Sequence, residues 1–237
     1  MNNKSALIVF CKEPKPGQVK TRLAQSFLDS HLSSSIEESH ELAFNCYHFF
    51  CNQIQQKLIQ FQSLFKELDV FICFDSENNP PPILNQVFEN QKFIPQSKGN
   101  LGQRMKIAFS SLFKLNYQKV ICIGTDSPDL EIAELIEGFH RLDSIDSVIG
   151  PCEDGGYYFI GIKNNQHQID TLLNTAMNNI NWSTSEVLKQ TELNFTQSEF
   201  SLEILNIWYD IDSLEDLKRY IKIFKPMDLP FLPKGIW

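Results

Sequence analysis

Short apolar runs bounded by turn residues recur along the 237-residue chain and constrain its fold more than any other feature. Continuous runs of this kind are typical of strands buried on both faces of a sheet. Segments with helical periodicity separate most of them, and this alternation predicts an α/β three-layer sandwich with a mainly parallel central sheet. The strands are predicted at 6–11, 70–74, 120–124, 147–150, 157–162 and 204–208, and the helices at 31–66, 101–115, 130–142, 184–191 and 214–224.

Length and composition favour one domain. The chain is longer than a small module but short for two α/β domains, and its 42% hydrophobic residues suffice for a sizeable core. It contains no internal repeat and no linker-like segment. We therefore expect a single domain over 1–237, with a core at about 6–224 and a C-terminal tail at 225–237 whose apolar residues lie against the body.

Charge and hydropathy exclude several classes of partner. The formal net charge of −8 argues against nucleic acid, whose phosphates require a basic face. No apolar run approaches the roughly 20 residues that span a bilayer, and the first run is too short for a signal peptide. These features predict a cytoplasmic protein without a membrane span.

Cysteine and histidine spacing argues against a zinc site or a Cys-His nucleophile. The six cysteines form no C-x-x-C pair and lie mostly within apolar runs, so we expect buried, reduced thiols, and we assign no role to Cys152. The five histidines form no group with ligand spacing.

A basic segment, residues 12–23, follows the first predicted strand and carries four basic residues against one acidic residue. Ligands bind at the carboxyl ends of strands in an open parallel sheet, so this segment is suited to a phosphate or diphosphate, although a solvated loop is the alternative. It lacks the Gly-Lys pair of a phosphate loop, and no G-x-G-x-x-G follows the strand. These absences weaken ATPase and dehydrogenase hypotheses.

Carboxylates follow three later apolar runs. Asp126 comes after the run at 120–124, where it could bind Mg²⁺ or Mn²⁺ or serve as an electrostatic partner of the next helix. Asp154 precedes a Gly-Gly pair that would permit close approach of a ligand, or it is a turn residue. Asp210 and Asp212 alternate, and would face the same side if the strand persisted; Asp212 could instead cap a helix.

Five motifs in a fixed order resemble one known family, the radical-SAM/selenodomain-associated or arsenosugar-biosynthesis-type glycosyltransferases. The match covers about residues 6–220, and it implies a single-domain glycosyltransferase-A fold of the nucleotide-diphospho-sugar transferase superfamily. The motifs are Lys12-x-Pro14-x-Pro16-Gly17-x-Val19-Lys20-Thr21-Arg22-Leu23, Gly99-Asn-Leu-Gly102-Gln-Arg104-Met105, Gly124-Thr-Asp126-Ser-Pro128-Asp-Leu130, Gly150-Pro-x-x-Asp154-Gly-Gly-Tyr157-Tyr and Asp210-Ile-Asp212-Ser-Leu-Glu-Asp-Leu217.

The resemblance also implies roles for individual residues. Asp126 and Asp212 would bind the metal, although Ser-Leu replaces the family's usual Thr-Pro after Asp212. Asp154 would face the donor or acceptor sugar and is the leading candidate for a general base, with Glu153 second. Lys20 and Arg22 would assist catalysis at the diphosphate. The nucleotide-binding residues would be Lys12, Pro14, Gly17, Lys20, Arg22, Gly102, Arg104 and Asp126.

Together these features predict a Mg²⁺- or Mn²⁺-dependent glycosyltransferase that uses a nucleotide-diphosphate sugar and a small-molecule acceptor. Asp126 supplies only the first carboxylate of an Asp-x-Asp motif, so the motif does not establish sugar transfer. One alternative is a nucleotidyltransferase that joins a nucleoside triphosphate to a phosphorylated small molecule. A second alternative is a nucleotide-binding module without turnover.

Overall fold

One seven-stranded sheet forms the centre of the computed structural model, which describes residues 4–76, 79–165, 167–224, 229–233 and 236. The strand order is β3-β2-β1-β4-β6-β5-β7, and only β6 runs antiparallel to its neighbours. The prediction of a mainly parallel sheet is therefore confirmed. The strands are β1 (Ser5–Cys11), β2 (Leu68–Phe74), β3 (Lys92–Pro95), β4 (Lys119–Ile123), β5 (Ser147–Pro151), β6 (Tyr157–Lys163) and β7 (Leu202–Ile204).

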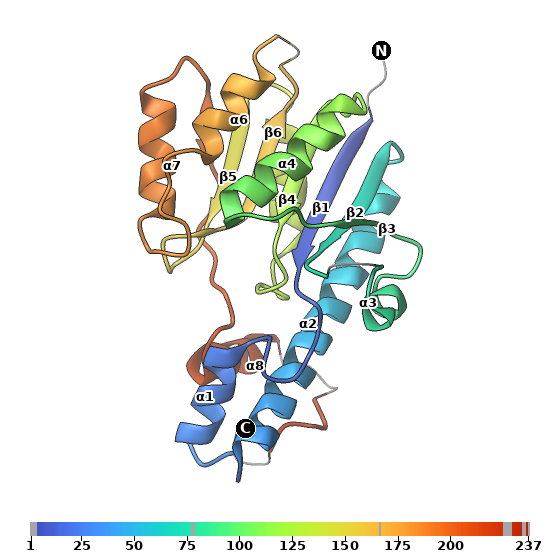
Figure 1. The fold of residues 1–237 in the computed structure, drawn as a ribbon, viewed down its shortest axis with the longest axis vertical. Coiled ribbons are helices and arrows are strands. Elements are labelled where there is room, and N and C mark those ends of the chain that lie inside the picture. Colours follow the sequence, from blue (N-terminus) through green and yellow to red (C-terminus); the bar gives the residue numbers. More distant parts are fainter. Residues whose placement is uncertain (1–3, 77–78, 166, 225–228, 234–235, 237) are drawn as a thin grey trace.

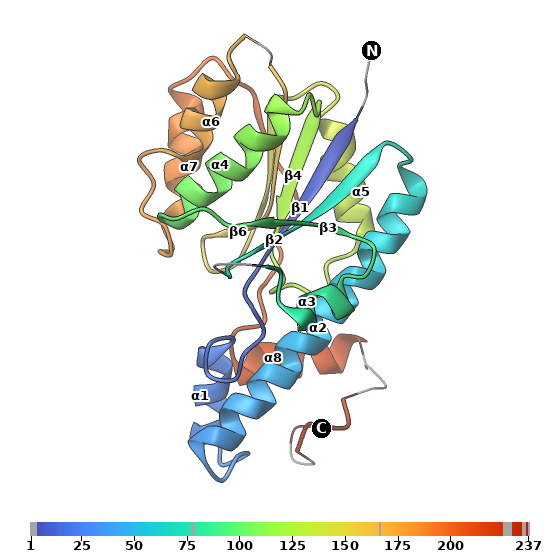
Figure 2. The same ribbon diagram turned by 45° about the vertical axis from the view of Figure 1, so that its right-hand side comes forward.

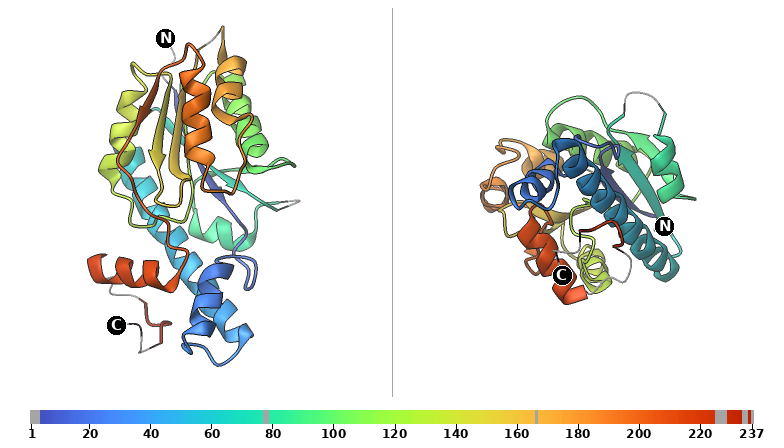
Figure 3. Two further views of the ribbon diagram at one scale, coloured as in Figure 1. Left: turned by 90° about the vertical axis from the view of Figure 1, so that its left-hand side faces the viewer. Right: turned by 90° about the horizontal axis from the view of Figure 1, so that it is seen from below.

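Helices cover both faces of the sheet, which explains why the strands read as continuous apolar runs. Along β1, Leu7 and Val9 enter one core and Ala6 and Ile8 enter the other. The first core lies under α2 (Ile36–Leu64), α3 (Pro82–Val87) and α5 (Ile132–Arg141). The second lies under α4 (Leu101–Lys114), α6 (Ile169–Met177) and α7 (Val187–Thr196) (Figures 1 and 3).

A third core lies beyond the carboxyl ends of the strands, in what we call the helical lobe (Figure 2). The lobe consists of α1 (Thr21–Asp29), the first half of α2 (residues 36–50), α8 (Leu214–Phe224) and the described part of the tail. Leu229, Leu232 and Ile236 of the tail are buried in it; residues 225–228, 234–235 and 237 lie outside the described part of the chain.

The predicted strand at 204–208 is wrong beyond its first residue. β7 ends at Ile204, and residues 205–213, which we call the crossing segment, leave the sheet edge and pass over the strand ends to α8. Only Trp208 of this segment forms an isolated bridge, with Cys152. The apolar run therefore marks a connection in which Leu205 is buried but Ile207 is 61% exposed, and a run this short does not distinguish such a connection from a strand.

The sequence predicts helix caps at Ser127 before Pro128, at Ser183 with Glu186 and at Ser213 with Asp216, and the structure forms only the last of these. The capping box at Ser213 and Asp216 is confirmed, since Asp216 Oδ2 accepts from Ser213 N at 2.8 Å and Ser213 Oγ accepts from Asp216 N at 3.3 Å. Ser127 does not cap α5, because its carbonyl closes a turn with Leu130 N and the helix begins later. The predicted box at Ser183 and Glu186 does not form.

Among the described residues, no helix combines the length and apolar composition needed to cross a membrane. All six cysteines are buried free thiols, as predicted.

The core of the helical lobe gives a stability prediction. Leu217 on α8 is fully buried, so Leu217→Ala removes apolar contacts and leaves a cavity that should cost about 3 kcal/mol of unfolding free energy. Ile223 on the same helix is 57% exposed, and Ile223→Ala should change it by less than about 1 kcal/mol. Urea unfolding measures both. Equal effects of the two substitutions would contradict the burial of this face.

Candidate functional site

Three segments meet at the carboxyl ends of β1 and β4, where the strand order changes direction. They are the basic segment after β1, the loop after β4 and the crossing segment. Backbone hydrogen bonds fix the crossing segment in place, from Ile211 N to Asp126 O and from Glu153 N to Trp208 O, both at 2.9 Å. Residues far apart in the sequence thus reach one edge of the sheet.

The basic segment contains a tight turn and then begins α1. Gln18 N donates to Lys15 O at 3.0 Å across Pro16 and Gly17, and Gly17 has a φ of 76°, as a type II turn requires. Lys20 also has a left-handed backbone, with φ 47° and ψ 43°, and is the N-cap of α1. The predicted loop therefore ends at Lys20, and Arg22 lies in the first turn of a helix.

The Lys20 ammonium lies between two carboxylates. Its Nζ is 2.5 Å from Asp126 Oδ1 and 2.9 Å from Asp212 Oδ1. The Lys20 side chain is 3% exposed, whereas those of Asp126 and Asp212 are 47% and 39% exposed. Burial acts to lower the pKa of Lys20, but the two carboxylates outweigh it and raise that pKa above its ordinary value. The structure thus brings together three of the predicted site residues, Lys20 from the basic segment, Asp126 from the loop after β4 and Asp212 from the crossing segment.

Asp212 also contacts the exposed Arg22, whose Nη1 lies 3.3 Å from Asp212 Oδ2. Burial acts to raise the pKa of Asp212, but Lys20 and then Arg22 lower it overall. The side chain of Lys12 is exposed and adds a weaker positive field at Asp212, and Pro14 is buried in the same segment. The basic segment therefore surrounds Asp212 with positive charge.

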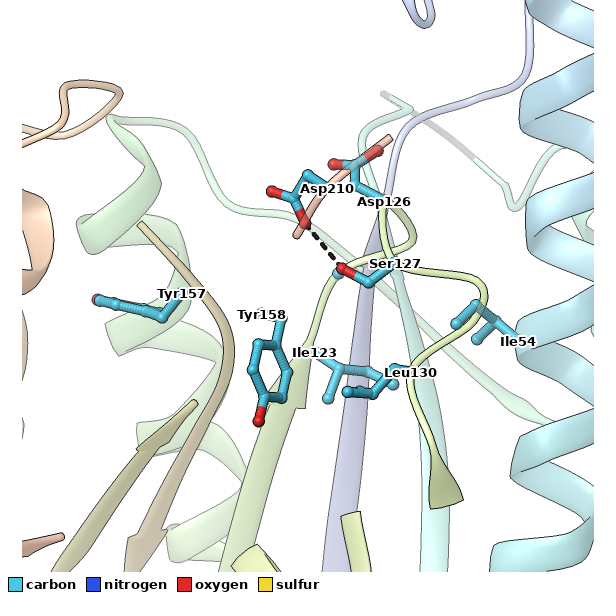
Figure 4. Close-up of a pocket in the computed structure, with 9 residues that line it drawn as sticks. Ile54, Ile123, Asp126, Ser127, Leu130, Tyr157, Tyr158 and Asp210 are labelled. Atoms are coloured by element: carbon cyan, nitrogen blue, oxygen red, sulfur yellow. Dashed lines mark hydrogen bonds between the residues drawn. The ribbon is translucent and has the colours of Figure 1, made fainter. Parts of the chain in front are cut away.

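Asp210 has different partners from Asp212, because the crossing segment is not a strand there. Its Oδ1 accepts from Ser127 Oγ at 2.7 Å (Figure 4). The same oxygen accepts from Cys152 Sγ at 3.5 Å. Burial, followed by the charge of Asp126, raises the pKa of Asp210 to about 6. The sequence did not single out Asp210 as a site residue, and its alternation with Asp212 was the one available signal.

Cys152, Asp154 and Asp210 offer ligand atoms that all lie within 4.8 Å of one another, the kind of group that could hold a metal ion. Cys152 is buried, and burial, followed by Asp210, raises the pKa of its thiol above the ordinary value. Carboxylate oxygens are the donors in this group that Mg²⁺ or Mn²⁺ would prefer. The sequence gave Cys152 no role, and nothing beside it in the chain revealed this neighbourhood.

Asp154 and Glu153 have local partners. Asp154 Oδ1 accepts from Gly156 N at 2.8 Å, which is the turn geometry that was the alternative to a sugar-binding role. Glu153 binds Arg219 Nη1 at 2.9 and 3.1 Å, so its carboxylate is already paired. Both side chains are exposed, and Glu153 is the one held in an ion pair with Arg219.

The glycine of the predicted ligand turn is packed against the chain itself. Gly155 has a φ of +87°, and a Cβ built there would lie 2.1 Å from the carbonyl oxygen of Ser185. Gly102 is also a packing residue, since a Cβ there would lie 2.2 Å from Trp182 Nε1. Both glycines permit another group to approach the backbone closely, and in each case that group belongs to the protein itself.

Arg104 reaches the strand ends on the other side of β1. Its Nη1 donates to Gln96 Oε1 at 2.6 Å, and Gln96 Nε2 donates to the carbonyls of Cys11 at 3.0 Å and Cys73 at 2.9 Å. Arg104 Nε is buried and has no hydrogen-bond partner among the described residues. Arg104 therefore lies beside β2 at this edge of the sheet, whereas Asp126 follows β4.

Tyr47 connects the loops after β1 and β4. Its hydroxyl accepts from Lys12 N at 3.0 Å and from Thr125 Oγ1 at 3.1 Å. The sequence gave no sign of this role, because Tyr47 occurs in a helix among many other aromatic residues. The contact helps to fix the distance between the basic segment and Asp126.

A small cavity of about 70 Å³ opens beside the carboxylates. Tyr158 is almost fully buried at its wall, and its hydroxyl lies 3.1 Å from Asn206 O, whereas Tyr157 points away from the carboxylates (Figure 4). The cavity is lined by Ile54, Ile123, Gly124, Asp126, Ser127, Leu130, Tyr157, Tyr158 and Asp210.

The family model DUF2064, described as an uncharacterized protein conserved in bacteria, matches residues 60–184, which is more than half of the chain. The chain belongs to this family. The matched part includes Arg104, Asp126 and Asp154, but not the basic segment or the crossing segment. No curated protein matches the chain.

Solved structures support the nucleotide-diphospho-sugar transferase superfamily. A candidate nucleotide-diphospho-sugar transferase from Desulfovibrio desulfuricans G20 is 26% identical, with a TM-score of 0.74 over 96% of this chain and 89% of its own. A 4-diphosphocytidyl-2C-methyl-D-erythritol synthase from Anaerococcus prevotii DSM 20548 is 9% identical, with a TM-score of 0.58 over 95% and 100%. A CMP:2-keto-3-deoxy-manno-octonic acid synthetase complexed with CTP is also 9% identical, with a TM-score of 0.50 over 94% and 98%. The first match supports the superfamily, and the other two share the fold.

Gly155 gives a second stability prediction. Gly155→Ala should cost about 2 to 4 kcal/mol, because alanine is strained at positive φ and its Cβ would overlap a backbone oxygen. Gly124→Ala is the matched control, since its Cβ would lie 4.0 Å from the nearest atom, Asp126 N, and the change should stay below about 1 kcal/mol. Thermal and urea unfolding would check both; a neutral Gly155→Ala would show that the turn is open.

Asp210 gives a pH prediction. Its pKa is about 6 in the folded protein against an ordinary value of 3.8, so the folded state holds this proton more tightly and stability should fall as the pH rises from about 4 to about 6. Asp210→Asn removes the cost of the buried negative charge. Near pH 8 in metal-free buffer, its free energy of unfolding should be roughly 1 to 3 kcal/mol higher than that of wild type. The difference should disappear below about pH 4. A difference independent of pH would contradict the raised pKa.

Proposed function

We propose that the protein is a metal-dependent glycosyltransferase that uses a nucleotide-diphosphate sugar and a small-molecule acceptor, of the arsenosugar-biosynthesis type that its motifs resemble. One observation carries the proposal. Asp126 and Asp212 converge on a single positive charge at the strand edge where ligands of parallel sheets bind, and Lys20 and Arg22 lie beside them. This combination of cations and carboxylates suits a diphosphate and its counter-ion.

The residues fit a divalent cation. Two carboxylate oxygens already lie within 3 Å of one cationic centre, and both side chains are partly exposed, so phosphate and water could complete an oxygen shell. Asp126 and Asp212 would hold the ion. When bound, Mg²⁺ or Mn²⁺ would neutralise charge that develops on the leaving diphosphate.

The chain's own residues would bind and orient the donor. Lys20 and Arg22 would donate to the diphosphate oxygens and stabilise them as the bond to the sugar breaks. The buried Arg104 Nε lacks a partner among the described atoms and could donate to the nucleotide, with Gly102 preceding it on the same helix. Backbone groups near Lys12, Pro14 and Gly17 would surround the phosphates.

Transfer requires one base. The acceptor oxygen would attack the anomeric carbon, the bond from that carbon to the phosphate oxygen would break, and the nucleoside diphosphate would leave. Asp154 would take the acceptor proton, because it is exposed and lies in the group with Asp210, whereas Glu153 is paired with Arg219.

Nucleotidyl transfer is the second candidate. The fold is shared with a cytidylyl-type synthase and with a synthetase that binds CTP. The same cations and carboxylates would serve attack at the α-phosphate, with pyrophosphate as the leaving group. The products therefore distinguish the two reactions.

The test incubates the protein with Mn²⁺, nucleotide sugars or nucleoside triphosphates, and a panel of hydroxylated and phosphorylated acceptors. Release of nucleoside diphosphate supports glycosyl transfer, and release of pyrophosphate supports the second candidate. Asp126→Asn should lower the turnover rate by about 100-fold or more, because it removes charge from the ion site. Asp170→Asn, on the exposed first turn of α6, should keep the wild-type rate. Nucleotide binding without any product would contradict both proposed reactions and favour a nucleotide-binding module without turnover.

A further inference from the structure

We propose that the ammonium of Lys20 and a divalent cation exclude each other at the Asp126–Asp212 pair, so that the ion binds there only when the nucleotide diphosphate draws Lys20 away. This inference rests on the metal-dependent transfer proposed above. It concerns how the free protein keeps its ion site neutralised, and it gives Lys20 a second role beyond contact with phosphate.

The geometry of the pair supports mutual exclusion. Lys20 Nζ lies 2.5 and 2.9 Å from the Oδ1 atoms of Asp126 and Asp212. A divalent ion held by the carboxylates of Asp126 and Asp212 would compete with Nζ for the same oxygens. Two cations at these oxygens would also repel each other strongly.

Lys20 is held where it lies unless another anion is offered. Its side chain is 3% exposed, and the ring centroid of Phe50 lies 5.8 Å from Nζ. A buried ammonium that lost both carboxylates would be left without a counter-charge, which is costly. Water alone therefore does not release Lys20, whereas a diphosphate beside Arg22 would provide a new partner.

The consequence is positive coupling between nucleotide and metal. In the free protein a divalent ion must displace Lys20 and binds weakly. A bound diphosphate both removes the competitor and adds phosphate ligands, so each ligand should strengthen the other's binding. The coupling belongs to Lys20 and should shrink when its charge is removed.

The experiment measures binding of Mn²⁺ alone, with free Mn²⁺ counted by electron paramagnetic resonance. Without nucleotide, Lys20→Met should bind Mn²⁺ about tenfold more tightly than wild type, since the competing charge is gone. Lys15→Met is the matched control, because it removes the same charge from the same segment but Lys15 pairs with Glu13. The control should match wild type.

Coupling is then measured with CDP, UDP, GDP and ADP, after correction for Mn²⁺ bound by free nucleotide. At least one of them should raise the Mn²⁺ affinity of wild type by a larger factor than that of Lys20→Met. If Lys20→Met does not fold by circular dichroism, Lys20→Gln replaces it, since an amide can still donate between the carboxylates.

The outcomes separate the two proposals. If nucleotide-loaded wild type binds Mn²⁺ but free Lys20→Met binds it no more tightly than free wild type, mutual exclusion is wrong and the metal-dependent function stands. If wild type binds no Mn²⁺ with any of the four nucleotides, both proposals fail. Equal tightening by Lys15→Met would also overturn the inference, because the effect would then be one of general charge.

Discussion

The ion triplet of Lys20, Asp126 and Asp212 is the interaction on which the site depends. It joins a left-handed residue at the start of α1, a loop after β4 and a segment that enters α8. A buried ammonium must be paired, so this contact favours one arrangement of the three segments. The triplet also joins the helical lobe to the edge of the sheet.

Backbone hydrogen bonds and the contacts of Tyr47 also hold these segments together. The crossing segment is fixed at Asp126 and at the end of β5, and Tyr47 fixes the start of the basic segment to Thr125. Asp210 and Asp212, two residues apart, therefore face separate partners. One is hydrogen-bonded to Ser127 near the cavity, and the other lies among the cations. The different surroundings of Asp210 and Asp212 therefore follow from the path of the backbone through the crossing segment.

Much of the fold could be predicted, because burial on both faces gives β1, β2, β4 and β6 continuous apolar runs, and burial on one side gives the helices α5 and α8 a strong apolar periodicity. Elements with few residues or partial exposure, such as α3 and β3, gave no such signal. The sequence also identified Lys20, Arg22, Asp126 and Asp212 as neighbours in space. It could not predict that Gly102 leaves room for Trp182 and Gly155 for the backbone of Ser185, because those contacts depend on tertiary packing. The contact between Cys152 and Asp210 depends on tertiary packing as well.

The 29-residue helix α2 has a further consequence. At 1.5 Å per residue it is about 44 Å long, and it contributes Phe50 to the lobe and Leu58 to the sheet as one unbroken rod. Because the continuous helix α2 runs through both the helical lobe and the layer that covers the sheet, this connection contains no hinge. Bending at this connection would require the helix to break. We therefore expect substrate to enter through changes in side-chain contacts and small loop movements, and not through closure of the helical lobe over the sheet.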